Sequence, residues 1–209
     1  MIPRFKPNFG ISEFQRIFRF NRNSVEKFER EFAKKFNAVD AVAFPYGRSA
    51  QWAFLKAVQL ENAEVIMPAY TCSVVAHAIS LSGNIPKFID IDLDNFNMNL
   101  EKLEEAINDR TKGIIATHTF GYAQDIDKLE KIIRNAEKKF GSKIYLIQDC
   151  CHAFSAEYNG RQISLSGDVA IYAFNISKTM SSIFGGMLTF QDESLAKKVR
   201  LWRDKNFFE

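Results

Sequence analysis

The sequence predicts an α/β fold in which a mostly parallel sheet is flanked by helices on both faces. Short apolar runs alternate with amphipathic helical stretches along most of the chain. The runs are continuously apolar rather than alternating between apolar and polar residues, as expected for strands buried on both faces. With 46% hydrophobic and 25% charged residues, the 209-residue chain has the composition of a globular protein with a sizeable core.

The elements follow from these patterns in order. The first 36 residues are expected to form two helices, the second with Ser24 as its N-cap. The apolar face of this second helix is expected to contain Val25, Phe28, Phe32 and Phe36. Strands are expected over residues 39–44, 64–67, 87–91, 113–117, 143–148, 168–174 and 187–190. Helices are expected over residues 50–60, 72–81, 100–107, 126–140 and from 193 to the end.

Two segments are expected in the domain organisation: a helical arm over residues 1–38 and one α/β domain over residues 39–209. The last helix reaches Glu209 without a stop signal, and Phe207 and Phe208 near its end are expected to be exposed. This pattern indicates a chain that ends short of a partner domain.

Composition and motifs exclude several classes of protein. A net charge of +3 does not indicate nucleic-acid binding, and no window is apolar enough for a membrane span. The first ten residues lack an apolar core, so a secretory signal is not expected, and three Cys are too few for a disulfide framework. A cytoplasmic location is therefore expected. His77, His118 and His152 are too far apart in sequence for a zinc site, and His77 is expected to be a buried core residue. No GxSxG motif supports a Ser-His-Asp enzyme.

Candidate site residues follow the expected strands, because ligands of open α/β sheets bind beyond the carboxyl ends of the strands. Gly47, Arg48 and Ser49 lead into a helix whose free amides and dipole favour a phosphate group, although the motif also fits an ordinary capped loop. Asp149 leaves an apolar strand, so its carboxylate either caps the next turn or holds a protonated ring nitrogen. Lys178 is either a surface charge or an amine that forms a Schiff base.

Together these segments resemble the DegT/DnrJ/EryC1/StrS sugar aminotransferases, which are fold-type-I pyridoxal phosphate enzymes. The resemblance is collinear from about Phe44 to Arg203. The segments that match are residues 47–50, 65–71, 83–92, 111–115, 148–153, 160–161 and 167–168, His118 with Gly121, and Lys178 with Gly185 and Gly186. The resemblance implies that residues 39–209 are a cofactor-binding large domain that ends before a small C-terminal domain.

The resemblance also implies roles for individual residues around pyridoxal 5'-phosphate. Lys178 would form the Schiff base with the cofactor and later move the Cα proton. Asp149 would pair with the ring nitrogen, and His152 would lie beside the ring. Arg48 and Ser49, with the helix amides that begin at Gly47, would hold the phosphate.

Three positions depart from the pattern of the family. Cys72 stands where relatives place a stacking aromatic, and Tyr70 or a smaller contact would replace that ring. Ala173 stands where relatives often have a phosphate-binding Ser, and Asn175 or Arg48 would compensate. Phe184 stands before the two glycines, where an acidic residue is common.

The implied reaction moves an amino group from an amino acid, glutamate by expectation, to a keto group on a nucleotide-linked deoxysugar. Such sugars enter surface polysaccharides and glycoconjugates, and a homodimer with a shared active site is implied. One alternative is a catalytically incomplete fragment that keeps the fold and acts as a binding or partner subunit. Another is a dehydratase of the same family; dehydratases commonly replace the Schiff-base lysine with His, which Lys178 argues against.

Overall fold

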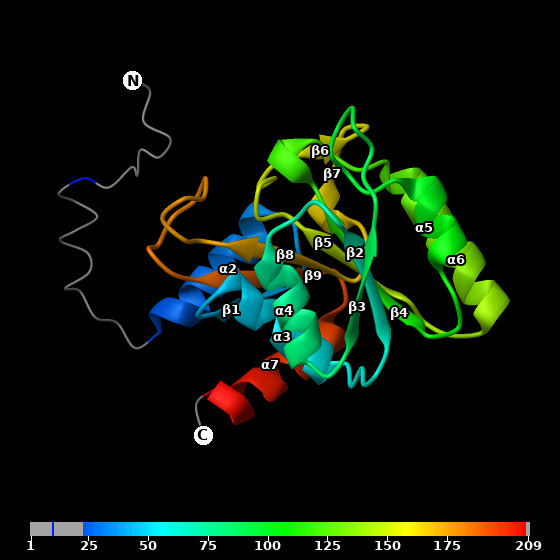
Figure 1. Ribbon diagram of the computed structural model, residues 1–209. Helices are drawn as coiled ribbons and strands as arrows, with labels where there is room; N and C mark the ends of the chain where they lie inside the picture. The colour runs from blue at the N-terminus through cyan, green and yellow to red at the C-terminus, as the bar shows by residue number, and fades with distance from the viewer. Residues whose placement is uncertain (1–9, 11–22, 208–209) are drawn as a thin grey trace.

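The computed structural model describes Gly10 and residues 23–207, and it contains a seven-stranded sheet (Figure 1). Strand β9 is antiparallel to both of its neighbours, and the other strands all run in one direction. In spatial order the strands are β1 (Asp40–Phe44), β9 (Gly186–Phe190), β8 (Val169–Ala173), β5 (Tyr145–Asp149), β4 (Thr111–Thr117), β2 (Glu64–Pro68) and β3 (Ile85–Ile89). The predicted mostly parallel α/β sheet is therefore confirmed.

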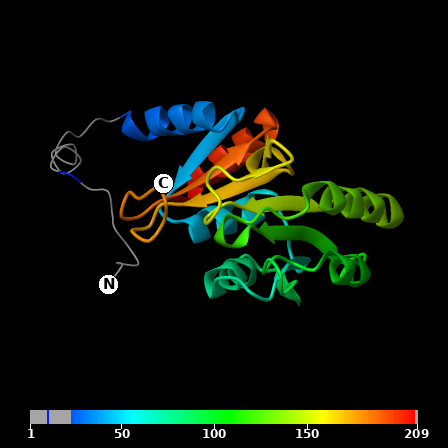
Figure 2. The ribbon, with the colours of Figure 1, turned by 90° about the horizontal axis from the view of Figure 1, so that it is seen from above.

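Helices cover both faces of this sheet, as Figures 1 and 2 show from two directions. One face packs against α3 (Gly47–Ala57), α4 (Ser73–Leu81) and α7 (Glu193–Phe207). The other face packs against α2 (Ser24–Lys35), α5 (Leu100–Ala106) and α6 (Ile126–Phe140). Successive residues of β4 alternate between the two cores: Ile115 points to the first, and Ile114 and Ala116 point to the second. This alternation confirms that the central strands are buried on both sides.

Helix α6 illustrates why the sequence predicted some elements accurately. The Asp125 side chain caps its start by accepting a hydrogen bond from the Lys128 amide at 3.0 Å. Gly141 ends the helix in the left-handed conformation, with φ at 63°. Between these two signals, the apolar residues at helical spacing are buried, so both bounds of the helix match the prediction.

Helix α2 differs from its prediction at its first turn. The helix begins at Ser24, so Asn23 occupies the N-cap position and Ser24 does not, and the Asn23 side chain makes no capping hydrogen bond. Phe32 and Phe36 are buried against Tyr172, whereas Val25 is 49% exposed and does not join this apolar face. The expected helix that precedes α2 lies outside the described residues.

The strand β3 also corrects the prediction. It spans Ile85–Ile89 rather than residues 87–91, and Ile89 is the one residue of the strand that is fully buried. The reason is its position: β3 is the outer strand of the sheet, so one of its sides has no neighbouring strand. The sequence pattern also missed the short hairpin of β6 (Glu157–Tyr158) and β7 (Arg161–Gln162), and the single turns η1 (Thr119–Gly121) and η2 (Ile163–Leu165).

The C-terminal helix α7 is packed more closely than its sequence indicated. The Phe207 ring is half-buried against Phe44, Trp52 and Trp202, so the expectation that Phe207 is exposed was wrong. Phe208 lies outside the described residues. The aromatic contacts tie the end of α7 to α3 and thereby fix the helix that starts at Gly47.

A buried ion network seals the outer edge of β1, the other edge strand. Glu29 of α2 accepts a hydrogen bond from the Ala43 amide at 2.7 Å and also pairs with Arg200 and Arg203 of α7. Arg200 donates to the Ala41 carbonyl at 2.8 Å, and Arg203 donates to the Ala43 carbonyl at 3.2 Å. The polar backbone groups that an edge strand leaves unpaired are thus satisfied by side chains.

Candidate functional site

Asp149 ends the central strand β5 and is 8% exposed. Its Oδ1 atom accepts a hydrogen bond from the Cys151 amide at 3.1 Å, and its Oδ2 atom lies 3.5 Å from the Thr117 hydroxyl. That hydroxyl lies 3.4 Å from the hydroxyl of Thr71 in the loop after β2. The carboxylate is therefore oriented by the Cys151 amide after β5 and by the Thr117 hydroxyl at the end of β4. It caps the turn after β5, which is one of the two roles considered for it from the sequence.

Lys178 lies in the loop that follows β8 and is half-buried. The Asn175 side chain accepts hydrogen bonds from the amide and hydroxyl of Ser177, and the Lys178 amide donates to the Asn175 carbonyl at 3.0 Å. The loop is closed where the Phe174 amide bonds the Gly185 carbonyl at 2.9 Å. Asn175 thus shapes the turn that presents Lys178, a role that the sequence pattern had not indicated.

His152 connects these two groups electrostatically. Its pKa is lowered by burial and by the positive charge of Lys178, whereas the Asp149 carboxylate opposes the change. Asp149 and Lys178 also affect the pKa of the neighbouring Cys151 thiol. Burial and the Asp149 charge raise this pKa well above its ordinary value, and the Lys178 charge opposes the increase. Lys178 and Asp149 therefore act on the same two side chains, and the structure brings Asp149, His152 and Lys178 to one end of the sheet.

Helix α3 begins beside the Lys178 loop. Its N-cap residue, Tyr46, makes no side-chain cap, so the first amides from Gly47 onward have no partner within the helix. Gly186 makes the close approach possible, because a Cβ atom on it would lie 2.5 Å from the Gly47 nitrogen. Arg48 is exposed, and its guanidinium lies 4.3 Å from the centre of the Tyr46 ring. The uncapped start of α3 and the exposed Arg48 guanidinium thus both lie at the carboxyl end of the sheet, which we call the rim.

Two of the three positions that depart from the family pattern are Ala173, at the end of β8, and Cys72, directly before α4. Ala173 ends β8, and its Cβ atom would lie 2.9 Å from a Cβ atom on Gly47, so no hydroxyl is available next to the start of α3. Cys72 is exposed and precedes α4. Tyr70, the suggested replacement ring, packs on Phe96 instead, with ring centres 5.6 Å apart.

Two of the three histidines occupy positions that the sequence did not indicate. His77 is exposed, so the expectation of a buried core residue was wrong: it lies on the outer side of α4. His118 is completely buried between Gln148 and Gln124. Its Nδ1 atom accepts a hydrogen bond from the Gln124 amide at 3.1 Å, so Nε2 carries the proton that is donated to Gln148 at 2.8 Å. Burial lowers the pKa of His118, although Gln148 and Asp149 oppose the shift.

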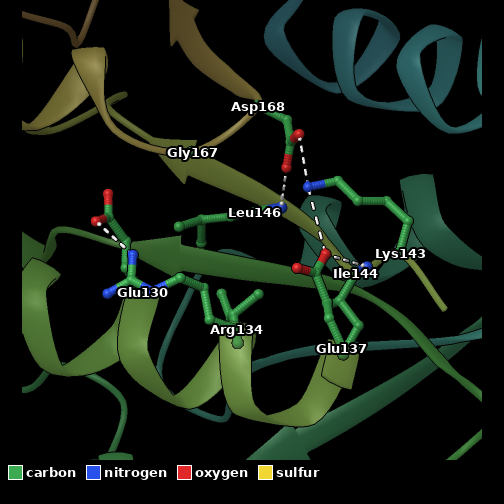
Figure 3. A pocket seen from close by; sticks show the side chains of 9 residues that line it. Glu130, Arg134, Glu137, Lys143, Ile144, Leu146, Gly167 and Asp168 are labelled. Carbon is green, nitrogen blue, oxygen red and sulfur yellow. Dashed lines mark hydrogen bonds and ion pairs between the residues drawn. The ribbon is translucent and has the colours of Figure 1, made fainter. Parts of the chain in front are cut away.

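A separate pocket of about 280 Å³ lies at the amino end of the sheet, between α6 and the starts of β5 and β8 (Figure 3). Its charges are paired: Lys143 lies 3.0 Å from Asp168 and 3.4 Å from Glu137, and Arg134 lies 3.5 Å from Glu130. The Lys143 pKa is raised: burial lowers it, but Asp168 and Glu137 outweigh that effect. This pocket is far from Asp149 and was not indicated by the sequence.

The described part of the chain contains neither a cluster of metal-binding side chains nor a membrane-spanning helix. Within Gly10 and residues 23–207, no group of three or more His, Cys, Asp or Glu side chains is arranged to hold a metal ion. Over the same residues, every helix is too short or too polar to cross a membrane.

The chain resembles known proteins both in sequence and in fold. The spore coat polysaccharide biosynthesis protein SpsC of Bacillus subtilis is 34% identical over 85% of this chain and 44% of its own length. A GDP-perosamine synthase of Caulobacter vibrioides is 32% identical over 86% of this chain and 47% of its own. The crystal structure of AtS13 from Actinomadura melliaura has a TM-score of 0.91 and 28% identity, covering 97% of this chain and 57% of its own.

The chain spans about half the length of the curated relatives that it matches. The profile of one family, described as the DegT/DnrJ/EryC1/StrS aminotransferase family, matches residues 16–207. The match includes the start of α3, Asp149, His152 and the Lys178 loop. The chain therefore belongs to the DegT/DnrJ/EryC1/StrS aminotransferase family.

Proposed function

We propose that this chain is the cofactor-binding part of a pyridoxal phosphate-dependent aminotransferase that acts on nucleotide-linked keto sugars. The observation that carries the proposal is that Asp149 at the end of β5, His152 shortly after it and Lys178 in the loop after the neighbouring parallel strand β8 lie at one carboxyl end of the sheet. The Lys178 amine, the Asp149 carboxylate and the His152 imidazole, whose pKa both charges affect, provide three groups for one polar aromatic ligand. Family membership supplies the reaction class.

The residues at this rim fit pyridoxal phosphate in their chemistry. A buried carboxylate that already accepts a backbone hydrogen bond can hold a protonated ring nitrogen. The uncapped start of α3, with Ser49 and the exposed Arg48, can hold the phosphate group. Gly186 keeps the backbone of β9 close to that helix start. Arg48 and Asn175 are the polar groups available where Ala173 has no hydroxyl.

The bound cofactor would supply an electron-withdrawing ring that stabilises negative charge at the Cα atom of an amino acid. Asp149 would maintain the proton on the ring nitrogen, and Thr117 and the Cys151 amide would keep its carboxylate in place. Lys178 would bind the cofactor and then, as a free amine, carry a proton to or from the Cα atom. His152 would lie against the ring, and Cys72 would take the position of the usual stacking side chain.

Relatives support the substrate class, because one is a GDP-perosamine synthase and another is a polysaccharide biosynthesis protein. We propose a nucleotide-linked keto-deoxysugar as acceptor and glutamate as amino donor. A homodimer would complete the site.

The test is cofactor capture by the purified chain. Pyridoxal phosphate is added, the absorption spectrum is recorded, the sample is reduced with borohydride and the labelled peptide is identified by mass spectrometry. We expect a yellow Schiff-base band and a label on Lys178, and we expect Lys178→Ala to lose both.

The matched control is Lys143→Ala, which removes a lysine from the opposite end of the sheet and should leave the band and the label intact. A colourless wild-type protein, or a label spread over surface lysines, would contradict the proposal.

A further inference from the structure

Four ring-bearing side chains follow four neighbouring strands at the carboxyl end of the sheet. His152 follows β5, Phe120 follows β4, Tyr70 follows β2 and Phe96 follows β3, which is the order of these strands in the sheet. Successive ring centres are 6.1, 6.4 and 5.6 Å apart, and the His152 and Phe120 planes are nearly parallel, at 12°. The Phe96 and Phe120 ring centres are also 6.4 Å apart, so Phe120, Tyr70 and Phe96 form a compact triangle next to His152. We call these four side chains the aromatic row, because they follow four strands in a row.

The row is open to solvent although most of its surface is apolar. Tyr70 is 46% exposed, Phe96 is 39% exposed and Phe120 is 63% exposed. A contiguous group of exposed aromatic rings is unfavourable in water and marks a binding surface more often than an ordinary one. Because the row begins at His152, its occupant would also reach the candidate cofactor site.

The rings are held in place by a buried amide. Asn97 is 1% exposed; its Nδ2 atom donates to the Tyr122 carbonyl at 3.0 Å, and its Oδ1 atom accepts from the Thr119 amide at 3.2 Å. The bonds join the loops that carry Phe96 and Phe120, whose φ angles of 61° and 54° are uncommon for bulky residues. Fixed rings lose little freedom when a ligand stacks on them, so the row is preorganised.

We infer that the aromatic row is the stacking site for the nucleobase of a nucleotide-linked substrate. This inference rests on the proposed function, in which the keto sugar reacts beside Lys178. Such a substrate has a reacting sugar at one end and a planar base at the other. Phe120 is the member of the row that contacts His152, and Tyr70 and Phe96 pack on Phe120 and follow the outer strands β2 and β3, so these two rings lie on the side of the row toward the edge of the sheet. Aromatic rings stack on any base, because every base has a π-face.

Isothermal titration calorimetry with GDP, and with dTDP as a pyrimidine counterpart, tests the inference on the full chain. We expect Phe96→Ala and Phe120→Ala to weaken the binding of both nucleotides about ten-fold or more. Phe96→Trp should keep the wild-type affinity, because it retains a ring. The control is Phe88→Ala: Phe88 lies on β3, the strand that precedes Phe96, and is 54% exposed, but it is outside the row.

Three outcomes would overturn the inference. The first is a wild-type chain that does not bind GDP or dTDP, or that binds inorganic pyrophosphate equally well. The second is unchanged nucleotide affinity in Phe96→Ala and Phe120→Ala. The third is a wild-type dimer that sedimentation velocity shows to dissociate in these variants, because the row would then be an interface between copies. Capture of pyridoxal phosphate by the same samples separates these outcomes from a failure of the proposed function.

Discussion

The charged side chains at the β1 edge and those at the carboxyl end of the sheet are partnered in different ways. At the β1 edge, Glu29 is almost fully buried and is matched by Arg200 and Arg203. At the carboxyl end, Asp149 and Lys178 influence the same imidazole, but neither is in an ion pair with any other described residue. The first region uses its charges to hold elements together. In the proposed function, the second region uses its charges to hold the cofactor, and mutations should separate the two roles.

Glu29→Ala should have the largest effect, on stability. It removes the buried carboxylate shared by Arg203, which is buried, and Arg200, which is half-buried, and it leaves the Ala43 amide without its acceptor; Asp204 and Asp40 remain as partners of the two arginines. Breaking a buried pair in this way costs about 3–5 kcal/mol of unfolding free energy. Urea denaturation measures the loss, and Glu31→Ala, at an exposed position of the same helix, is the control. A loss below about 1 kcal/mol would show that the β1 network does not anchor α2 and α7.

Asp149→Asn should chiefly change cofactor binding. The amide keeps the oxygen that accepts the Cys151 amide but loses the charge that would hold the ring nitrogen. Hydrogen bonds to charged groups contribute about 1.5–3 kcal/mol, so the affinity for pyridoxal phosphate should fall roughly 10- to 150-fold. Fluorescence titration measures it.

The matched variant is Asp168→Asn, at the opposite end of the sheet, where the carboxylate pairs with Lys143. It should lose about 1 kcal/mol of stability and keep its cofactor affinity. Equal affinity losses in the two variants would erase the distinction between paired and unpaired charges.

His118 should make the stability of the protein fall in acid. Because burial lowers its pKa in the folded state, the unfolded chain binds a proton first as the pH falls below about 6.5. The stability is therefore complete above pH 6.5 and decreases below it, with a slope of at most about 1.4 kcal/mol per pH unit. Denaturation between pH 7.5 and pH 5 should show a shallower slope in His118→Gln. In His77→Gln, which changes an exposed imidazole, the slope should match wild type.

Arg48→Ala should have the smallest effect of the four. Its exposed guanidinium is proposed to assist phosphate binding where Ala173 lacks a hydroxyl, and exposed charge contacts contribute about 0.2–1 kcal/mol. The affinity for pyridoxal phosphate should therefore fall by no more than about five-fold. Arg134→Ala, in the ion-paired pocket, should leave it unchanged. If Arg48→Ala and wild type bind pyridoxal phosphate with identical affinity, Arg48 does not compensate for the hydroxyl that is missing at Ala173.

Local signals allowed the sequence to predict much of the fold. The bounds of α6 were correct because a capping Asp, an apolar helical face and a terminal Gly all lie within one stretch. The same reasoning failed at β3 and at His77, because exposure there depends on which strand lies at the edge and which side of α4 faces the core. Neither can be read from neighbouring residues.

The candidate site was predictable in part. The sequence identified Asp149, His152 and Lys178 as residues at or after the ends of apolar strands. Only the structure shows that Asp149 and Lys178 are both close enough to affect the pKa of His152. The aromatic row was not predicted. Tyr70, Phe96 and Phe120 lie in three separate loops, and only the strand order β5–β4–β2–β3 brings their rings into contact with one another.

The sequence by itself determined the alternation of strands and helices and the residue types at the ends of the strands, because hydrophobic period and capping act over a few residues. The tertiary structure decided which of these residues meet, which strand became the edge, and which charges found partners. Those outcomes depend on strand order and on contacts across long stretches of chain, such as Glu29 with Arg203, that no local pattern specifies.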